Sequence, residues 1–124
     1  MNAKQIVPTE IRYHKKSRVL EIAFGDHERC QLTAEFLRVH SPSAEVSGHG
    51  PGQGVLQLGK EDVGIDRIEP VGNYAVRLYF DDGHDTGLYS WEEFHHFCLR
   101  SEELWADYLS RLAAAGHQRK STSS

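Results

Sequence analysis

Apolar and polar residues alternate near the start of the chain with the period of two that is typical of a half-buried β-strand. Leu20, Ile22 and Phe24 share one face of such a strand, and Glu21 lies on the other face. A shorter alternation comes before them, across the polar stretch 14–17. The pattern therefore predicts an N-terminal β-hairpin that turns at 14–17 and returns over 19–24.

The clearest strand and turn signals of the chain run from Ile65 to Ser90, with alternation over 76–80. The dipeptides Gly72-Asn73 and Asp82-Gly83 interrupt it, and both tolerate the positive φ angles of tight hairpin turns. We predict a three-stranded antiparallel meander whose first strand lies at a sheet edge, because Pro70 has no N–H to donate. The predicted strands are 65–71, 74–81 and 84–90.

Helical signals follow each group of strands. Thr33 is suited to cap a short helix that ends before Pro42, because proline disfavours helical geometry in the residue before it. Ser90 and Glu93 have the spacing of a capping box. A helical C-terminus should follow them, with a second start at Ser101. We expect its apolar stripe to lie on the sheet; the stripe consists of Leu104, Trp105, Tyr108, Leu109 and Leu112.

Together these elements predict an α+β fold. Its parts are a bent antiparallel β-sheet (the N-terminal hairpin plus the meander), a short helix after the hairpin, and a helical C-terminus packed on one face. Gly116 should end the last helix. We therefore expect a single domain over 1–116 and a disordered polar tail over 117–124.

Length and charge narrow the class of protein. A chain of 124 residues fits one domain, and its formal charge of −4 leaves no basic excess to hold a nucleic acid. No apolar run approaches the roughly 20 residues needed to span a bilayer, and the N-terminus has no secretory signal pattern. Cys30 and Cys98 are too few for a disulfide framework, so they favour a reducing cytoplasm, with Cys98 a buried, unreactive thiol.

The sequence contains none of the catalytic motifs that we looked for. It has no G-x-S-x-G and no H-E-x-x-H, and the glycine-rich stretch 47–54 lacks the spacing of a phosphate-binding loop. The paired acids, such as Asp81-Asp82, are explained by turns and helix starts. We therefore predict that the protein is not an enzyme.

Three short segments resemble a known family, the gamma-butyrobetaine hydroxylase N-terminal-like domain. They are Phe36–Ala44, which reads FLRVHSPSA, then Asp82-Gly83-His84, then Tyr89-Ser90-Trp91. This small domain of unknown function occurs alone in many bacteria and also fused ahead of the oxygenase domain of the hydroxylases. The resemblance does not imply oxygenase activity here, because that chemistry needs a separate iron-binding jelly-roll domain for which 124 residues leave no room.

The resemblance also implies a place for a metal. In metal-binding members, three cysteines and the histidine of the DGH element form a Cys₃His zinc site, which suits a closed tetrahedral structural site. The matching positions here are Ser41, Ser43, Val46 and His84. Only the histidine is kept, and neither a serine hydroxyl nor a valine replaces a thiolate. The resemblance thus implies that the zinc site is lost.

Two interpretations of His84 remain open. A weaker site for zinc or iron could combine His84 with His40, Glu45 and His49, since imidazole and carboxylate suit both metals. The interpretation that we favour involves no metal or other cofactor. In a two-residue hairpin turn, His84 would lie opposite Asp81, and the two would form an exposed contact.

The favoured function is a non-enzymatic interaction or scaffold module of the cytoplasm. Its partner would be another protein or a second copy of the chain, because edge strands offer docking surface. The alternatives are a metal-binding protein and an accessory subunit of an enzyme supplied in trans.

Overall fold

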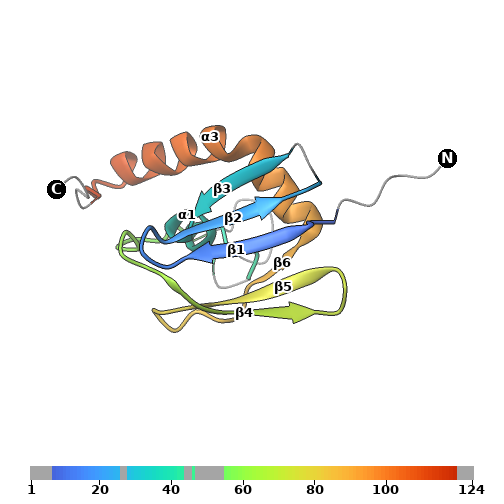
Figure 1. Ribbon diagram of the computed structural model, residues 1–124. Coiled ribbons are helices and arrows are strands. Elements are labelled where there is room, and N and C mark those ends of the chain that lie inside the picture. Colours follow the sequence, from blue (N-terminus) through green and yellow to red (C-terminus); the bar gives the residue numbers. More distant parts are fainter. Residues whose placement is uncertain (1–6, 26–27, 44–45, 47–54, 120–124) are drawn as a thin grey trace.

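The computed structural model describes residues 7–25, 28–43, 46 and 55–119, and it has the predicted α+β fold (Figure 1). Two three-stranded antiparallel sheets, ordered β1-β2-β3 and β4-β5-β6, pack with two helices. The first sheet and the short helix are β1 (Glu10–His14), β2 (Val19–Ala23), β3 (Arg29–Thr33) and α1 (Ala34–Val39). The second sheet and the long helix are β4 (Ile65–Val71), β5 (Ala75–Phe80), β6 (Leu88–Ser90) and α3 (Trp91–Ala114).

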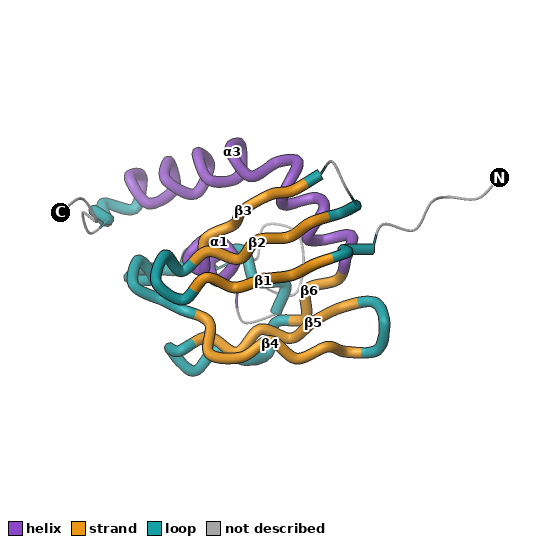
Figure 2. Tube along the Cα trace, in the orientation of Figure 1, coloured by secondary structure: helices purple, strands orange, loops and turns teal. Residues whose placement is uncertain are grey.

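Strand β3 is the element that the sequence analysis missed. It pairs antiparallel with β2, with Leu32 opposite Leu20, so the predicted hairpin is part of a three-stranded sheet (Figure 2). Arg29, Gln31 and Thr33 are exposed and Leu32 is buried, which is the alternation of a strand. With a single strongly apolar residue in five, this segment carried too little signal to be recognised.

Helix α1 begins as predicted, because the Thr33 side chain accepts a hydrogen bond of 3.0 Å from the Phe36 N–H. Every residue of the helix is buried, including two charged ones, Glu35 and Arg38. Buried charges require partners. The partners of Glu35 and Arg38 come from distant parts of the chain and are described below.

Helix α3 has the predicted capping box between Ser90 and Glu93, and a kink at Arg100 (φ −117°, ψ 15°) marks the expected second start at Ser101. Gly116 follows the helix with φ +75°. The apolar stripe was predicted only in part, since Leu109 is 39% exposed. Tyr108 and Leu112 pack with Val39 of α1 and with Leu56.

One hydrophobic cluster joins both sheets, α1 and the first half of α3. Its largest fully buried side chains are Tyr89, Phe94, Leu20, Ile22, Leu37 and Leu78. Strand β4 lies at a sheet edge, as its proline predicted. Among the described residues, no helix has both the length and the apolarity that a membrane crossing requires.

The two cysteines contradict the sequence-based expectation. Cys30 of β3 and Cys98 of α3 form a disulfide across 68 residues of chain, with 5.8 Å between their Cα atoms. The prediction of an inert free thiol was therefore wrong, because β3, which places Cys30 beside α3, was not recognised. The cysteines no longer argue for a reducing compartment, and the cytoplasmic location stays a prediction.

Candidate functional site

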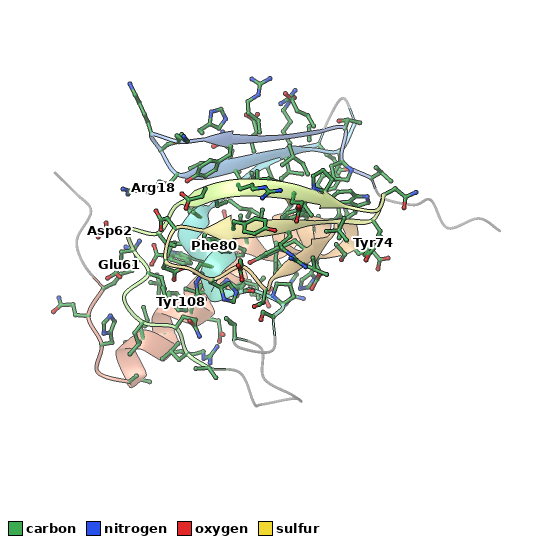
Figure 3. All side chains as sticks on the ribbon, turned by 90° about the horizontal axis from the view of Figure 1, so that it is seen from below. Arg18, Glu61, Asp62, Tyr74, Phe80 and Tyr108 are labelled. Atoms are coloured by element: carbon green, nitrogen blue, oxygen red, sulfur yellow. A yellow bond between two sulfur atoms is a disulfide. The ribbon has the colours of Figure 1, made fainter. Side chains whose placement is uncertain are left out.

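His84 lies on the buried side of the β5–β6 connection. The Phe80 N–H donates to the His84 carbonyl oxygen (2.9 Å), so the loop contains three residues, 81–83, with Gly83 at φ +92°. This pairing is one residue away from the two-residue turn that the sequence predicted, and such a shift moves a side chain to the other face. His84 is therefore 5% exposed, and its ring lies next to that of Phe80, which Figure 3 labels. The expected exposed contact with Asp81 was wrong.

The partner of His84 is Ser41, the first of the three positions where the resemblance implies a zinc cysteine. Ser41 Oγ and His84 Nε2 are 2.9 Å apart and hydrogen bonded, and Ser41 is 1% exposed. The other two positions lie on the same segment: the Ser43 N–H donates to Ser41 Oγ (3.2 Å), and the Val46 N–H donates to the Ser43 carbonyl (2.9 Å). A hydrogen-bonded serine–histidine pair thus joins the two segments that a metal would join in metal-binding members.

The donor set at these positions does not fit a Cys₃His zinc site. It has one imidazole, two hydroxyls and an apolar side chain in place of three thiolates. Among the described residues, no group of three or more His, Cys, Asp or Glu is arranged to hold a metal. Glu45 and His49 lie outside the described residues, so the alternative site that includes them stays a prediction.

His40, a second described histidine of that alternative, packs against α3. Its Nδ1 is 2.9 Å from the Phe36 carbonyl oxygen, and its ring contacts Phe36, Phe97 and Tyr108. Burial lowers the pKa of His40, although hydrogen bonds to backbone carbonyls oppose the shift. His40 is therefore held among aromatic rings, whereas His84 is bonded to Ser41.

Gly87 packs directly against the Ser41 hydroxyl of the serine–histidine pair. A Cβ at this position would lie 2.6 Å from Ser41 Oγ and 3.1 Å from a ring carbon of Tyr89. Both neighbours are buried side chains with little room to move. A residue larger than glycine therefore cannot be accommodated without displacing the Ser41 hydroxyl.

We expect Gly87→Ala to lower the free energy of unfolding by about 1–3 kcal/mol through overpacking. Denaturant unfolding would measure the loss. The matched control makes the same change in a Ser41→Ala background, where the clashing oxygen is absent and the cost should be smaller. An equal cost in both backgrounds would show that the close approach to Ser41 is not the cause.

A second polar cluster, centred on Asp82, fixes the loop that carries His84. Asp82 Oδ2 accepts from Arg38 Nε (2.9 Å) and Lys60 Nζ (2.8 Å), and Oδ1 accepts from the His84 N–H (3.2 Å). Arg38 also donates to Gln57 Oε1 (3.1 Å). The sequence analysis explained Asp82 as a turn residue and missed this role. The available signal was Arg38, a charge between the apolar residues Leu37 and Val39 of a short helix.

Asp82 should make stability depend on pH at the acid end. Burial raises its pKa, but the hydrogen bonds from Lys60, the His84 N–H and Arg38 outweigh burial and lower the pKa to about 2, from the ordinary 3.8. A lowered folded-state pKa stabilises the protein above pH 4, and that stabilisation is lost as the pH falls through 2.

We expect this contribution to be about 2 kcal/mol, since one pKa unit corresponds to about 1.4 kcal/mol. Urea unfolding of the wild type and of Asp82→Asn at pH 5 and at pH 2 would measure it. The wild type should lose about 2 kcal/mol more than the variant between these two pH values. Equal losses would assign the acid sensitivity to other carboxylates.

Comparison with known proteins agrees with the resemblance seen in the sequence. Residues 11–95 match the model of the family described as gamma-butyrobetaine hydroxylase-like, N-terminal. No curated protein matches the chain. Two solved structures, both described as NMR solution structures, are 49% and 48% identical to this chain, with TM-scores of 0.82 and 0.79. The first alignment covers 98% of this chain and 95% of the other, and the second covers 96% and 90%.

A crystal structure from Acidithiobacillus ferrooxidans is similar to a smaller part of the chain. It is 40% identical, has a TM-score of 0.59, and aligns with 72% of this chain and 89% of its own. That protein is described as one of unknown function in the DUF971 family. Residues 11–95, which match the family model, include Ser41, Ser43, Val46 and His84. The chain belongs to the gamma-butyrobetaine hydroxylase-like N-terminal domain family.

Proposed function

We propose that the chain is a non-enzymatic interaction module that binds an extended segment of a partner protein. The observation that carries this proposal is an apolar groove between the edge strands of the two sheets. The groove has a volume of about 420 Å³. It is lined by Pro8, Thr9, Glu10 and Ile11 on the β1 side and by Ile68, Pro70, Val76 and Trp91 on the other.

Strands β1 and β4 are each the outermost strand of their sheet, and residues of both line the groove. They are bridged at one point, where the Ile65 N–H donates to the Tyr13 hydroxyl (3.0 Å). An edge strand offers backbone N–H and C=O groups to another chain. An extended peptide would add to such an edge and place its side chains in the groove.

The serine–histidine pair does not support a catalytic function. Ser41 and His84 are 1% and 5% exposed, and Gly87 packs directly on the Ser41 hydroxyl. A nucleophile must reach a substrate carbonyl at about 3 Å. With no such access, the pair supports a structural role, and a partner that is itself an enzyme would make this module its accessory subunit.

Pro70 offers a test of the groove, because it lines the groove and is exposed. We expect the variant Pro70→Arg to lose partners that the wild type captures from the native host. The matched control is Leu99→Arg, a change on α3 at a residue that is 68% exposed. The control should keep those partners. Partners retained by Pro70→Arg, or lost equally in both variants, would overturn the proposal.

Metal content separates this proposal from the metal-binding alternative. We expect the triple variant Ser41→Cys, Ser43→Cys, Val46→Cys to bind about one zinc ion, because it restores three thiolates next to His84. We expect untagged wild-type protein to carry none. Adding His84→Ala to the triple variant should weaken its zinc binding. Stoichiometric zinc or iron in the wild type that disappears with His84→Ala would favour the alternative function.

A further inference from the structure

Glu35 is a buried carboxylate whose partner comes from the end of the chain. Its side chain is 6% exposed, and it accepts two hydrogen bonds from Arg119, one of them from Nε at 2.8 Å. The Arg119 guanidinium also lies over the ring of Trp105, 5.4 Å from its centroid. Residues 117–119, which we expected to belong to a disordered tail, thus include a side chain seated in a specific site.

This combination selects a guanidinium group rather than any cation. A carboxylate that receives two parallel N–H donors matches the planar fork of arginine, and an aromatic face stacks on the same plane. Lysine has a single ammonium and cannot make both contacts. A buried carboxylate is also costly without a cation, so the site favours occupation.

The site continues into a cavity that Arg119 does not fill. A cavity of about 390 Å³ lies between β3 and α3, next to Arg119. Its lining includes Gln31 and Thr33 of the edge strand β3 and Glu102 of α3. Arg119 is the only basic residue among the lining residues, and Glu35 and Glu102 are both acidic. The space therefore suits the residues that flank an arginine in a polar or basic segment.

Arg119 is a replaceable occupant. It lies beyond the end of α3, outside any helix or strand, and its side chain is 29% exposed. We propose that the Glu35–Trp105 site is a binding site for an arginine side chain of a partner protein, which Arg119 occupies in cis until the partner displaces it. The site is separate from the β1–β4 groove, and the inference does not depend on that groove.

The test uses the full-length chain and a peptide of defined sequence. The probe is the octapeptide HQRKSTSS, which has the sequence of residues 117–124. Binding is followed by the NMR signal of the Trp105 indole N–H. We expect the Arg119→Ala chain to bind the probe, and the wild type to bind it about tenfold more weakly, because its own arginine competes at a high effective concentration.

Two changes test the chemistry of the site. Replacing the arginine of the probe by lysine should weaken binding to Arg119→Ala about tenfold. Adding Glu35→Gln to Arg119→Ala should do the same while the circular dichroism spectrum stays unchanged. If that chain does not fold, Trp105→Leu takes its place, and calorimetry then measures the binding of the probe. Equal binding by wild type and Arg119→Ala, or no binding by a folded Arg119→Ala chain, would overturn the proposal.

Light scattering distinguishes a partner from a second copy of the chain. We expect the wild type and Arg119→Ala to have the same mass at every concentration. A wild-type dimer that dissociates in Arg119→Ala would show that the site takes the tail of another copy, and would overturn the assignment to a partner protein. Because no variant here alters the β1–β4 groove, none of these results tests the proposed function itself.

Discussion

Reduction of the Cys30–Cys98 disulfide should lower the free energy of unfolding by about 4 kcal/mol. The bond closes a loop across 68 residues, and a cross-link of that length removes much of the conformational freedom of the unfolded chain. For a domain of this size, 4 kcal/mol is a large part of the total stability. Guanidinium unfolding of the oxidised protein with and without a phosphine reductant would measure the change.

The control for this experiment is the double variant Cys30→Ala, Cys98→Ala. It should unfold at the same denaturant concentration with and without reductant, and close to that of the reduced wild type. Thiol titration of the unfolded, unreduced wild type should find no free thiol, because the chain has only these two cysteines. Two titratable thiols, together with no effect of reductant on unfolding, would contradict the disulfide.

Asp82→Ala should lower the free energy of unfolding by about 3 kcal/mol. The change removes the carboxylate that neutralises Arg38, whose side chain is 9% exposed, and a buried charge without its partner costs about 3–5 kcal/mol. It also removes the acceptor of the His84 N–H, so the loop that presents His84 to Ser41 loses an anchor. Urea unfolding at pH 7 would measure the loss.

Asp85→Ala is the matched control, because Asp85 is an exposed carboxylate in the same connection between β5 and β6. It should change stability by no more than about 0.5 kcal/mol. Combining Asp82→Ala with Arg38→Met should recover part of the loss, since the pair is then replaced by an apolar side chain. Equal effects of Asp82→Ala and Asp85→Ala would show that the buried arginine does not depend on this carboxylate.

The elements that were predicted correctly have local causes. Strand β4 ends at the predicted residue because Gly72 follows it in a turn with φ +54°. The caps of α1 and α3 were correct because Thr33 and Ser90 bond to N–H groups three residues away. Such contacts join residues that are close in the sequence, so they can be predicted without knowledge of the rest of the fold.

The site could be predicted only in part. The family resemblance located Ser41, Ser43, Val46 and His84, and the structure bonds Ser41 to His84. The prediction that His84 lies on the exposed face was wrong, because the dipeptide Asp82-Gly83 is compatible with both a two-residue and a three-residue loop. The structure contains the three-residue loop, in which His84 pairs with Phe80 rather than with Asp81. That choice buries the imidazole next to Ser41.

The sequence by itself determined the α+β class, the meander, the helix caps and the family, because period-two alternation, capping and turn residues act over a few positions. Only the tertiary structure decided which distant residues meet: Cys30 with Cys98, Asp82 with Arg38, and Glu35 with Arg119. These pairs are separated by 44 to 84 residues. They form because the packing of β3, α1 and α3 around one core brings them together, and no local pattern records that packing.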